Sequence, residues 1–215
     1  MKLTLKNIGK IGTASVEING ITVIAGENNT GKSTVGRALF AVFNSFCNVQ
    51  KQIENERVDS IENLLDRMYM NGNSRFMRIA NTNEIAKTIV AHIDLYRQAE
   101  LFDMQKNIMD LLVQYDEGKI ESFDENTIAE TVSRIKDVLN VSGIDFLKSV
   151  LERKLDAEFN EQVCNIFSGD DGEIQLQIKD KIITVSVENE GSVDIQNPGD
   201  VSLHTEVVYI DDPFV

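Results

Sequence analysis

Nine consecutive residues, 26–34, combine glycine, lysine and hydroxyl side chains at a spacing that suits one kind of chemistry. They read Gly-Glu-Asn-Asn-Thr-Gly-Lys-Ser-Thr and match the pattern Gly-x(4)-Gly-Lys-[Ser/Thr]. Glycines let a backbone turn successive amide groups toward an anion, and the adjacent lysine supplies positive charge. The pattern is that of a phosphate-binding loop, or Walker A motif, which holds the triphosphate of ATP together with magnesium.

The glycines and the lysine of this loop have distinct predicted tasks. Gly26 and Gly31 are expected to take backbone conformations that are closed to other residues. Lys32 is expected to reach the β- and γ-phosphates, and we predict a catalytic role for it because it offsets charge as the γ-phosphoryl group leaves. The start of the following helix adds N–H groups without helical partners.

Five of the other six residues complete the predicted nucleotide site. Asn28, Asn29 and Thr30 offer amides and side-chain donors near the γ-phosphate. The Ser33 hydroxyl is the expected magnesium ligand, and Thr34 is positioned to contact the α-phosphate region. The cofactors implied by the loop are therefore ATP and Mg²⁺.

The segments around the loop predict a strand, a loop and a helix in that order. Residues 2–8 and 14–18 alternate polar and apolar side chains, which is typical of half-buried strands. Residues 21–25 form a β-branched apolar run and predict a fully buried strand just before the loop. A helix is expected over 32–46, where apolar residues recur at helical spacing.

The remainder of the chain predicts a helical segment followed by a return to strands. Asn81 and Glu84 have the spacing of a capping box at one helix start. Helices are expected near 50–70, 81–115, 125–140 and 143–167, and strands near 173–178, 182–188, 192–196 and 206–210. We therefore predict a β-rich, ATP-binding lobe made of 1–47 and 169–215, interrupted by a helical insert, or arm, over 48–168.

Composition narrows the class of protein. The chain has 215 residues, 42% of them apolar, and a net charge of -14. No apolar run approaches the roughly 18 residues that a membrane span requires, and no signal-peptide pattern opens the chain, so we expect a cytoplasmic protein without a membrane span. Cys47 and Cys164 are predicted to be buried free thiols, and with His92 and His204 isolated a zinc site is not expected.

The charge is unevenly distributed along the chain. Residues 1–50 carry five basic side chains (Lys2, Lys6, Lys10, Lys32 and Arg37) against two acidic ones, whereas the remaining residues are strongly acidic. A basic lobe around a phosphate site is electrostatically sensible. The acidic remainder argues against this chain wrapping nucleic acid by itself, because phosphate contacts need lysine and arginine.

Two stretches of the chain resemble a known family. Residues 6–11 (Lys-Asn-Ile-Gly-Lys-Ile) and 20–33, which include the loop, are similar to the N-terminus of ABC-type ATPase heads of the SMC, RecF and OLD group. The pair Asn28–Asn29 is most similar to the OLD-like and related bacterial sequences of AAA-family ATP-binding proteins. The resemblance is specific over 1–46 and looser over 172–212.

The resemblance implies both a fold and a function. The implied fold is α/β, the N-terminal lobe of an ABC-ATPase-like P-loop NTPase with a mixed β-sheet around the Walker A helix. The implied function is that of an ATPase working in DNA repair or phage defence through ATP-dependent dimerisation. Its partners would be nucleotide, a second copy in a homodimer, and DNA or a nuclease.

Two elements of that family pattern are missing or ambiguous. A signature motif like Leu-Ser-Gly-Gly-Gln is not found. Residues 207–213 (Val-Val-Tyr-Ile-Asp-Asp-Pro) resemble a Walker B strand, in which Asp211 would hold magnesium through water and Asp212 would replace the catalytic glutamate. The alternative is a further lobe strand that ends at an acidic turn. We expect the chain to be an N-terminal portion of a larger ATPase that binds nucleotide weakly and hydrolyses it slowly or not at all.

Two other functions compete with this interpretation. One is the nucleotide-binding subunit of a membrane transporter, although such subunits usually stack adenine on an aromatic residue before the loop, and here the first aromatic is Phe40, after it. The other is an interaction module that nucleotide stabilises without turnover, with the acidic helical arm as its partner-binding surface.

Overall fold

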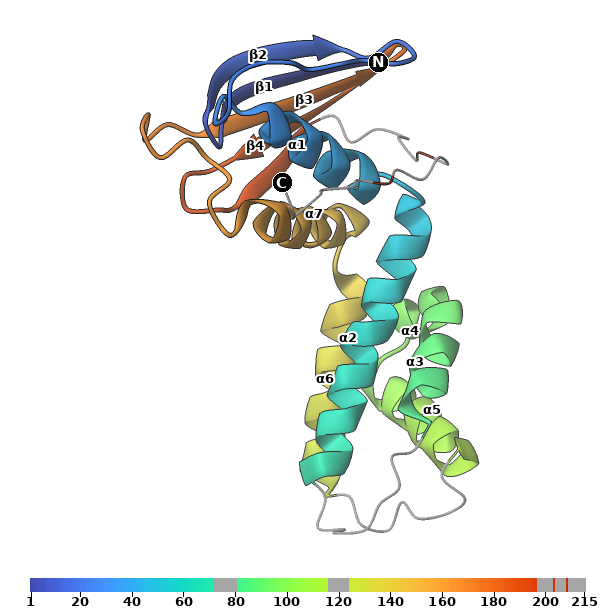
Figure 1. Cartoon of the computed structure of the whole chain (residues 1–215). Coiled ribbons are helices and arrows are strands. Elements are labelled where there is room, and N and C mark those ends of the chain that lie inside the picture. Colours follow the sequence, from blue (N-terminus) through green and yellow to red (C-terminus); the bar gives the residue numbers. More distant parts are fainter. Residues whose placement is uncertain (72–80, 116–123, 197–202, 204–207, 209–215) are drawn as a thin grey trace. The chain divides into compact units, whose positions relative to one another are not determined.

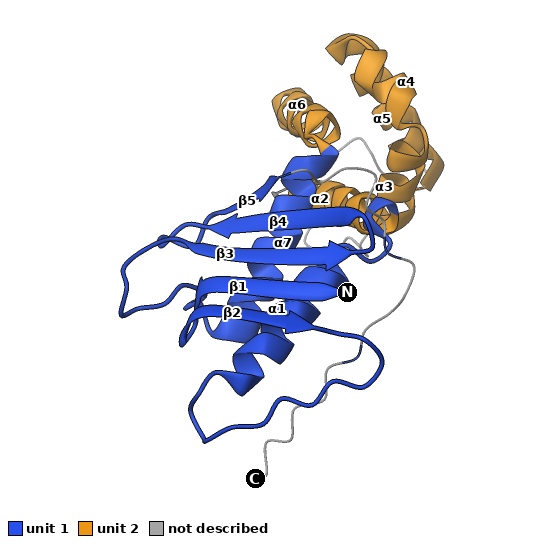
Figure 2. Cartoon of the chain, turned by 90° about the horizontal axis from the view of Figure 1, so that it is seen from above, with its two compact units in different colours: residues 1–50, 143–215 blue, residues 51–142 orange. Residues whose placement is uncertain are grey.

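The chain folds into two compact units in the computed structural model, which describes residues 1–71, 81–115, 124–196, 203 and 208. The first unit contains 1–50 and 143–215, and the second contains 51–142 (Figures 1 and 2). The predicted α/β class is confirmed, because the described residues form one sheet and seven helices. The strands are β1 (Lys2–Ile8), β2 (Ile11–Glu17), β3 (Gly172–Ile178), β4 (Lys181–Val187) and β5 (Val193–Gln196). The helices are α1 (Lys32–Ser45), α2 (Val49–Asn71), α3 (Thr82–Ala91), α4 (Ile93–Gln98), α5 (Leu101–Tyr115), α6 (Glu125–Asn140) and α7 (Gly143–Phe159).

The sheet has the strand order β2-β1-β3-β4-β5, and each neighbouring pair is antiparallel. The prediction of a mixed sheet is therefore wrong for the part of the chain that the structure describes. Three of the four pairings join strands that follow each other through short turns, and such hairpins are antiparallel by necessity. The fourth, β1 with β3, joins the two β-rich segments across the intervening helices.

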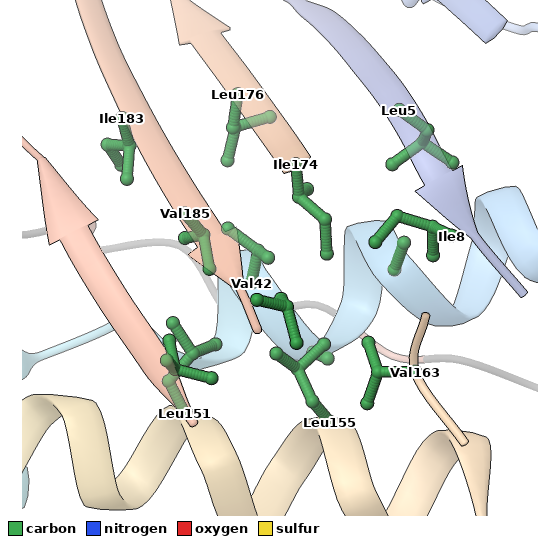
Figure 3. Close-up of a cluster of buried hydrophobic side chains, with 14 of the residues drawn as sticks. Leu5, Ile8, Val42, Leu151, Leu155, Val163, Ile174, Leu176, Ile183 and Val185 are labelled. Atoms are coloured by element: carbon green, nitrogen blue, oxygen red, sulfur yellow. The ribbon is translucent and has the colours of Figure 1, made fainter. Parts of the chain in front are cut away.

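The core of the first unit lies between one face of the sheet and the helices α1 and α7. Figure 3 shows strand side chains such as Leu5, Ile174 and Val185 meeting Val42 of α1 and Leu155 of α7, all at most 1% exposed. Fully burying each such side chain contributes about 1.5–3 kcal/mol before entropy is counted. The other face of the sheet carries mainly polar side chains, as the alternation of β1 predicts.

Helix α7 belongs to this unit and not to the helical arm. The predicted arm ended at residue 168, whereas the second unit ends at Ser142 and the first unit resumes at Gly143. Every fourth residue along one stripe of α7 is buried in the core beside the sheet, and the stripe comprises Leu147, Leu151, Leu155 and Phe159. Polar contacts add to this packing. Lys154 Nζ donates to the Asn44 carbonyl at 2.9 Å, and the Val193 amide donates to Glu152 Oε1 at 3.1 Å.

Helix α7 also ends earlier than the apolar pattern predicts. Asn160 and Glu161 have φ values of 52° and 64°, in the left-handed region that terminates helices. The chain then turns back, and Cys164 pairs with Ile8 in an isolated bridge beside β1. The sequence pattern extended the helix because Val163 continues its apolar stripe. In the structure Val163 is buried, but it lies in the segment after α7 and not in the helix.

Both cysteines are buried free thiols, as predicted. Cys164 Sγ donates to the Val187 carbonyl at 3.4 Å, and burial raises the pKa of its thiol. A thiol in that environment stays neutral and unreactive, so its role is packing.

The second unit is a helical bundle with its own hydrophobic core, formed by α2 to α6. The predicted single helix over 81–115 is interrupted at His92 and again at Ala99, and so becomes α3, α4 and α5. At Ala99 the backbone is extended, with φ -66° and ψ 144°. The breaks let residues from all three helices enter one core, among them Ile89, Tyr96 and Met104.

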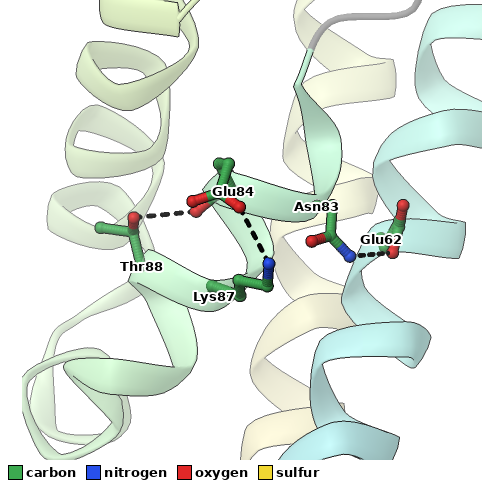
Figure 4. A network of polar contacts seen from close by, with 5 residues as sticks. All are labelled: Glu62, Asn83, Glu84, Lys87 and Thr88. Carbon is green, nitrogen blue, oxygen red and sulfur yellow. Dashed lines mark hydrogen bonds and ion pairs between the residues drawn. The ribbon is translucent and has the colours of Figure 1, made fainter.

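Polar contacts fix the start of α3 against α2 (Figure 4). Asn83 Nδ2 donates to Glu62 Oε2 at 2.6 Å, on the neighbouring helix. Glu84 accepts from Lys87 Nζ at 2.8 Å, and its carbonyl accepts from the Thr88 hydroxyl. Asn81 is the N-cap residue, but its side chain makes no capping bond. The predicted capping box is therefore not formed, because the Glu84 carboxylate pairs along the helix instead.

Candidate nucleotide-binding site

The segment before the loop differs from its prediction. Residues 21–25, expected to be a buried strand, form no strand, and the side chains of Ile21 and Val23 are 95% and 83% exposed. A strand is stable only where a neighbour pairs with its N–H and C=O groups. The five-stranded sheet ends at β2 on this side and does not include the segment. Apolar, β-branched composition therefore did not suffice to make this strand.

Two left-handed residues shape the loop itself. Gly31 has φ 89° and Asn29 has φ 69°, whereas Gly26 does not adopt a positive φ. Left-handed residues interspersed along a turn direct successive amides to one side and form an anion-binding concavity. The prediction that both glycines supply this freedom is right for Gly31 and wrong for Gly26. Asn29 takes the second position because asparagine tolerates this region better than most side chains.

Lys32 closes the loop on itself. Its Nζ donates to the Gly26 carbonyl at 2.8 Å and also to the Glu27 carbonyl. The Thr30 hydroxyl donates to the same Glu27 carbonyl at 2.9 Å. An ammonium group has three N–H donors, so two hold the loop and one can reach a ligand. The charge of Lys32 is thus fixed over the loop before any ligand arrives.

The first turn of α1 adds a positive electrostatic environment. Helix α1 begins at Lys32, and its N-cap, Gly31, offers no side chain to accept from the first amides. The first turn also contains no acidic residue. N-terminal amides and the helix dipole both favour an anion at this position. Ser33 is exposed there, whereas Thr34 is half-buried.

The turn between β1 and β2 packs directly on the loop, which the sequence did not indicate. A Cβ on Gly9 would lie 3.2 Å from Thr34 Cγ2, and one on Gly31 would lie 2.8 Å from Ile11 Cγ1. Between these two contacts, Lys10 Nζ donates to Asn29 Oδ1. In the sequence, Lys10 stands out only as one of the basic residues of 1–50. Its role depends on a turn geometry that no local pattern encodes.

The structure brings the predicted nucleotide-binding residues 26–34 into one loop and helix start, but it leaves part of the predicted site untested. Asp211 and Asp212 lie outside the described residues, as does the predicted strand at 206–210 except for Val208, which is 80% exposed and not in a strand. Within the described part of the chain, no group of three or more His, Cys, Asp and Glu residues could hold a metal ion.

A surface hollow of about 440 Å³ lies elsewhere on the first unit. Its lining includes Met1 and Lys2 at the beginning of β1 and Gln177 at the end of β3. The loop lies near the opposite end of β1, beside the turn at Gly9. The hollow is therefore no part of the candidate phosphate site.

No described helix is both long enough and apolar enough to span a membrane. Comparisons with protein-family models, with curated proteins and with solved structures found no match for this chain.

Proposed function

We propose that this chain binds ATP and magnesium through residues 26–34, as the ATP-binding part of an ATPase similar to the SMC, RecF and OLD group. One observation carries the proposal: the Walker A sequence folds into a loop that Lys32 closes by donating to the Gly26 carbonyl at 2.8 Å, directly before a helix without a side-chain cap. Fixed positive charge and inward-turned amides are what a triphosphate requires.

Each group has a part in this proposal. The amides of 28–31 and the start of α1 hold phosphate oxygens, and the third N–H of Lys32 donates to the β- or γ-phosphate. The exposed Ser33 hydroxyl is the protein ligand of magnesium. When bound, magnesium offsets the charge of the phosphates and orients them. The residues present fit these tasks, because a hydroxyl and an ammonium stand side by side at the helix start.

The biological setting we propose is DNA repair or phage defence, with ATP-dependent homodimerisation and a DNA or nuclease partner. The resemblance of residues 1–46 supports it. We further propose that this chain alone turns ATP over slowly or not at all. Rapid steady turnover by the purified chain, lost in Lys32→Ala, would contradict that part.

The binding proposal is tested by calorimetric titration of the full chain with MgATP. We expect saturable binding, weakened about 100-fold or more by Lys32→Ala, because the variant loses a charge-assisted bond and the closure of the loop. The matched control is Lys6→Ala, since Lys6 is exposed on β1 and outside the loop. Undetectable binding to the wild-type chain at millimolar MgATP, or equal affinity of wild type and Lys32→Ala, would refute the proposal.

A second candidate, an interaction module stabilised by nucleotide without turnover, is favoured by the separate core of the 51–142 unit. Here the helical unit would hold a partner protein while nucleotide stabilises the sheet unit. A partner found for the full chain should then bind equally well to the Lys32→Ala variant saturated with MgATP and to the wild type. Binding that requires ATP turnover would exclude this candidate.

A further inference from the structure

We propose that Lys10 is a second phosphate-binding cation of this site, supplied from outside the Walker A motif, and that it makes the site prefer ATP over ADP. The inference rests on the proposed function. Its basis is that the β1–β2 turn holds Lys10 against the loop, where its Nζ donates to Asn29 Oδ1.

The turn that carries Lys10 is held in place from three sides. Gly9 contacts Thr34 at the start of α1, and Ile11 contacts Gly31 at the end of the loop. The Gly9 amide also donates to the Val163 carbonyl at 2.8 Å. Ile11 is itself buried in the core of the first unit. The contacts of Gly9 and Ile11 thus hold the turn against the loop, and the backbone of Lys10 cannot move away without breaking them.

The side chain of Lys10 already spans from the turn to the loop. An exposed lysine loses rotamer entropy when it is ordered, so a single exposed bond to a neutral amide holds it only weakly. In the structure the Lys10 ammonium bonds to the side chain of Asn29, the left-handed residue at the centre of the loop. An ammonium bound to an amide oxygen gains when a phosphate oxygen replaces that acceptor, because charge-assisted bonds are roughly twice as strong.

Charge then gives the preference between nucleotides. Two lysines, Lys10 and Lys32, and the start of α1 surround the loop, and Glu27 is the acidic residue within it. Asn29 belongs to the part of the loop that we assign to the γ-phosphate. A cation bound to Asn29 therefore lies where ATP has a phosphate and ADP has none, so its Coulomb attraction favours ATP. Release of the Asn29 side chain also allows its N–H₂ group to turn toward the same phosphate.

The test is the affinity of three variants for MgATP and MgADP, measured by calorimetry on the full chain. We expect Lys10→Met to weaken MgATP binding about 10-fold and MgADP binding less than about 3-fold. Lys10→Arg keeps the charge and should recover most of the MgATP affinity. The control Lys6→Met removes an exposed lysine of β1, outside the turn and the loop, and neither affinity should change.

The outcomes separate this inference from the function on which it rests. If the wild type binds neither nucleotide, the proposed function fails. If the wild type binds and Lys10→Met binds MgATP equally tightly, the inference is overturned and the function stands. Equal weakening of MgATP and MgADP also overturns it, because Lys10 would then only position the loop. The melting temperature of Lys10→Met without nucleotide should match that of wild type, and a marked fall would likewise indicate a purely structural role.

Discussion

Gly31 and Ile11 approach so closely that position 31 has no room for a side chain: a Cβ there would lie 2.8 Å from Cγ1 of Ile11. The second glycine of the candidate loop therefore meets two requirements in this protein, a left-handed backbone with φ 89° and the proximity of a buried side chain. Through this contact the residue that follows the β1–β2 turn packs directly on the candidate phosphate-binding loop.

The first prediction concerns that contact. Gly31→Ala should reduce the free energy of unfolding by about 2–3 kcal/mol, of which about 1 kcal/mol comes from the left-handed backbone and the rest from the clash. Urea denaturation measures it. Gly20→Ala is the matched control, because Gly20 has φ 72° but open space around its Cβ position, so only the backbone term applies. Equal reductions in the free energy of unfolding of the two variants would show that Ile11 moves aside without an energetic penalty.

The second prediction tests the exposed segment before the loop. Val23→Ser should change the free energy of unfolding by no more than about 0.5 kcal/mol, because the side chain is 83% exposed. Leu5→Ala, at a position 1% exposed in the core, should cost about 2–5 kcal/mol in the same urea titration. A loss of about 2 kcal/mol or more in Val23→Ser would mean that 21–25 is a buried strand after all.

The third prediction compares two helix starts in the helical unit. The Asp124 carboxylate accepts from the Thr127 amide at 3.3 Å at the start of α6. Asp124→Ala should destabilise this unit by about 1 kcal/mol, as loss of an N-cap bond does. Asn81→Ala should cost clearly less, because the Asn81 side chain makes no capping bond to α3. Thermal unfolding followed by circular dichroism gives both values, and a larger loss for Asn81→Ala would contradict the assignment of caps.

The fourth prediction concerns acid stability. Lys148 Nζ lies 2.7 Å from Asp194 Oδ1, and this hydrogen bond lowers the pKa of Asp194 and raises the pKa of Lys148. In the unfolded chain Asp194 takes up its proton near a pH of about 3.9, before the folded chain does. Acid therefore favours the unfolded state, and the contribution of the pair is present above that pH and is lost as pH falls through the lower, folded pKa.

The check is the melting temperature of wild type and variants between a pH of about 6 and about 3. Asp194→Asn should show a shallower decline than wild type, because it has no carboxyl group to protonate. Lys148→Met should be shallower as well, since it removes the first cause of the pKa shift of Asp194. The pair is solvent-exposed, so the difference should shrink at high salt. Parallel curves for all three proteins would show that the pair does not couple to folding.

Local sequence patterns predicted most elements of the fold correctly. Alternation in β1 and the helical spacing of α1 each describe a surface with one buried side, and the buried side can be read from a few neighbouring residues. The same patterns assigned α7 to the helical arm, although it packs in the core of the sheet unit. An apolar stripe shows that one side of a helix is buried, but it does not show which element that side packs against. They also predicted one continuous helix through His92 and Ala99, where the structure has three helices. Neither break is marked by a glycine or a proline.

The candidate site divides in a similar way. The sequence alone predicted the chemistry proposed for 26–34, since the order of glycine, lysine and hydroxyl residues matches the phosphate-binding pattern. Only the tertiary structure decided that 21–25 lies outside the sheet, that Asn29 and not Gly26 takes the left-handed conformation, and that Lys10 reaches the loop. The physical reason is distance along the chain: the contacts of Gly9 and Ile11 join residues 20 or more positions apart, and β1 pairs with β3 across the intervening helices. No local periodicity encodes these contacts.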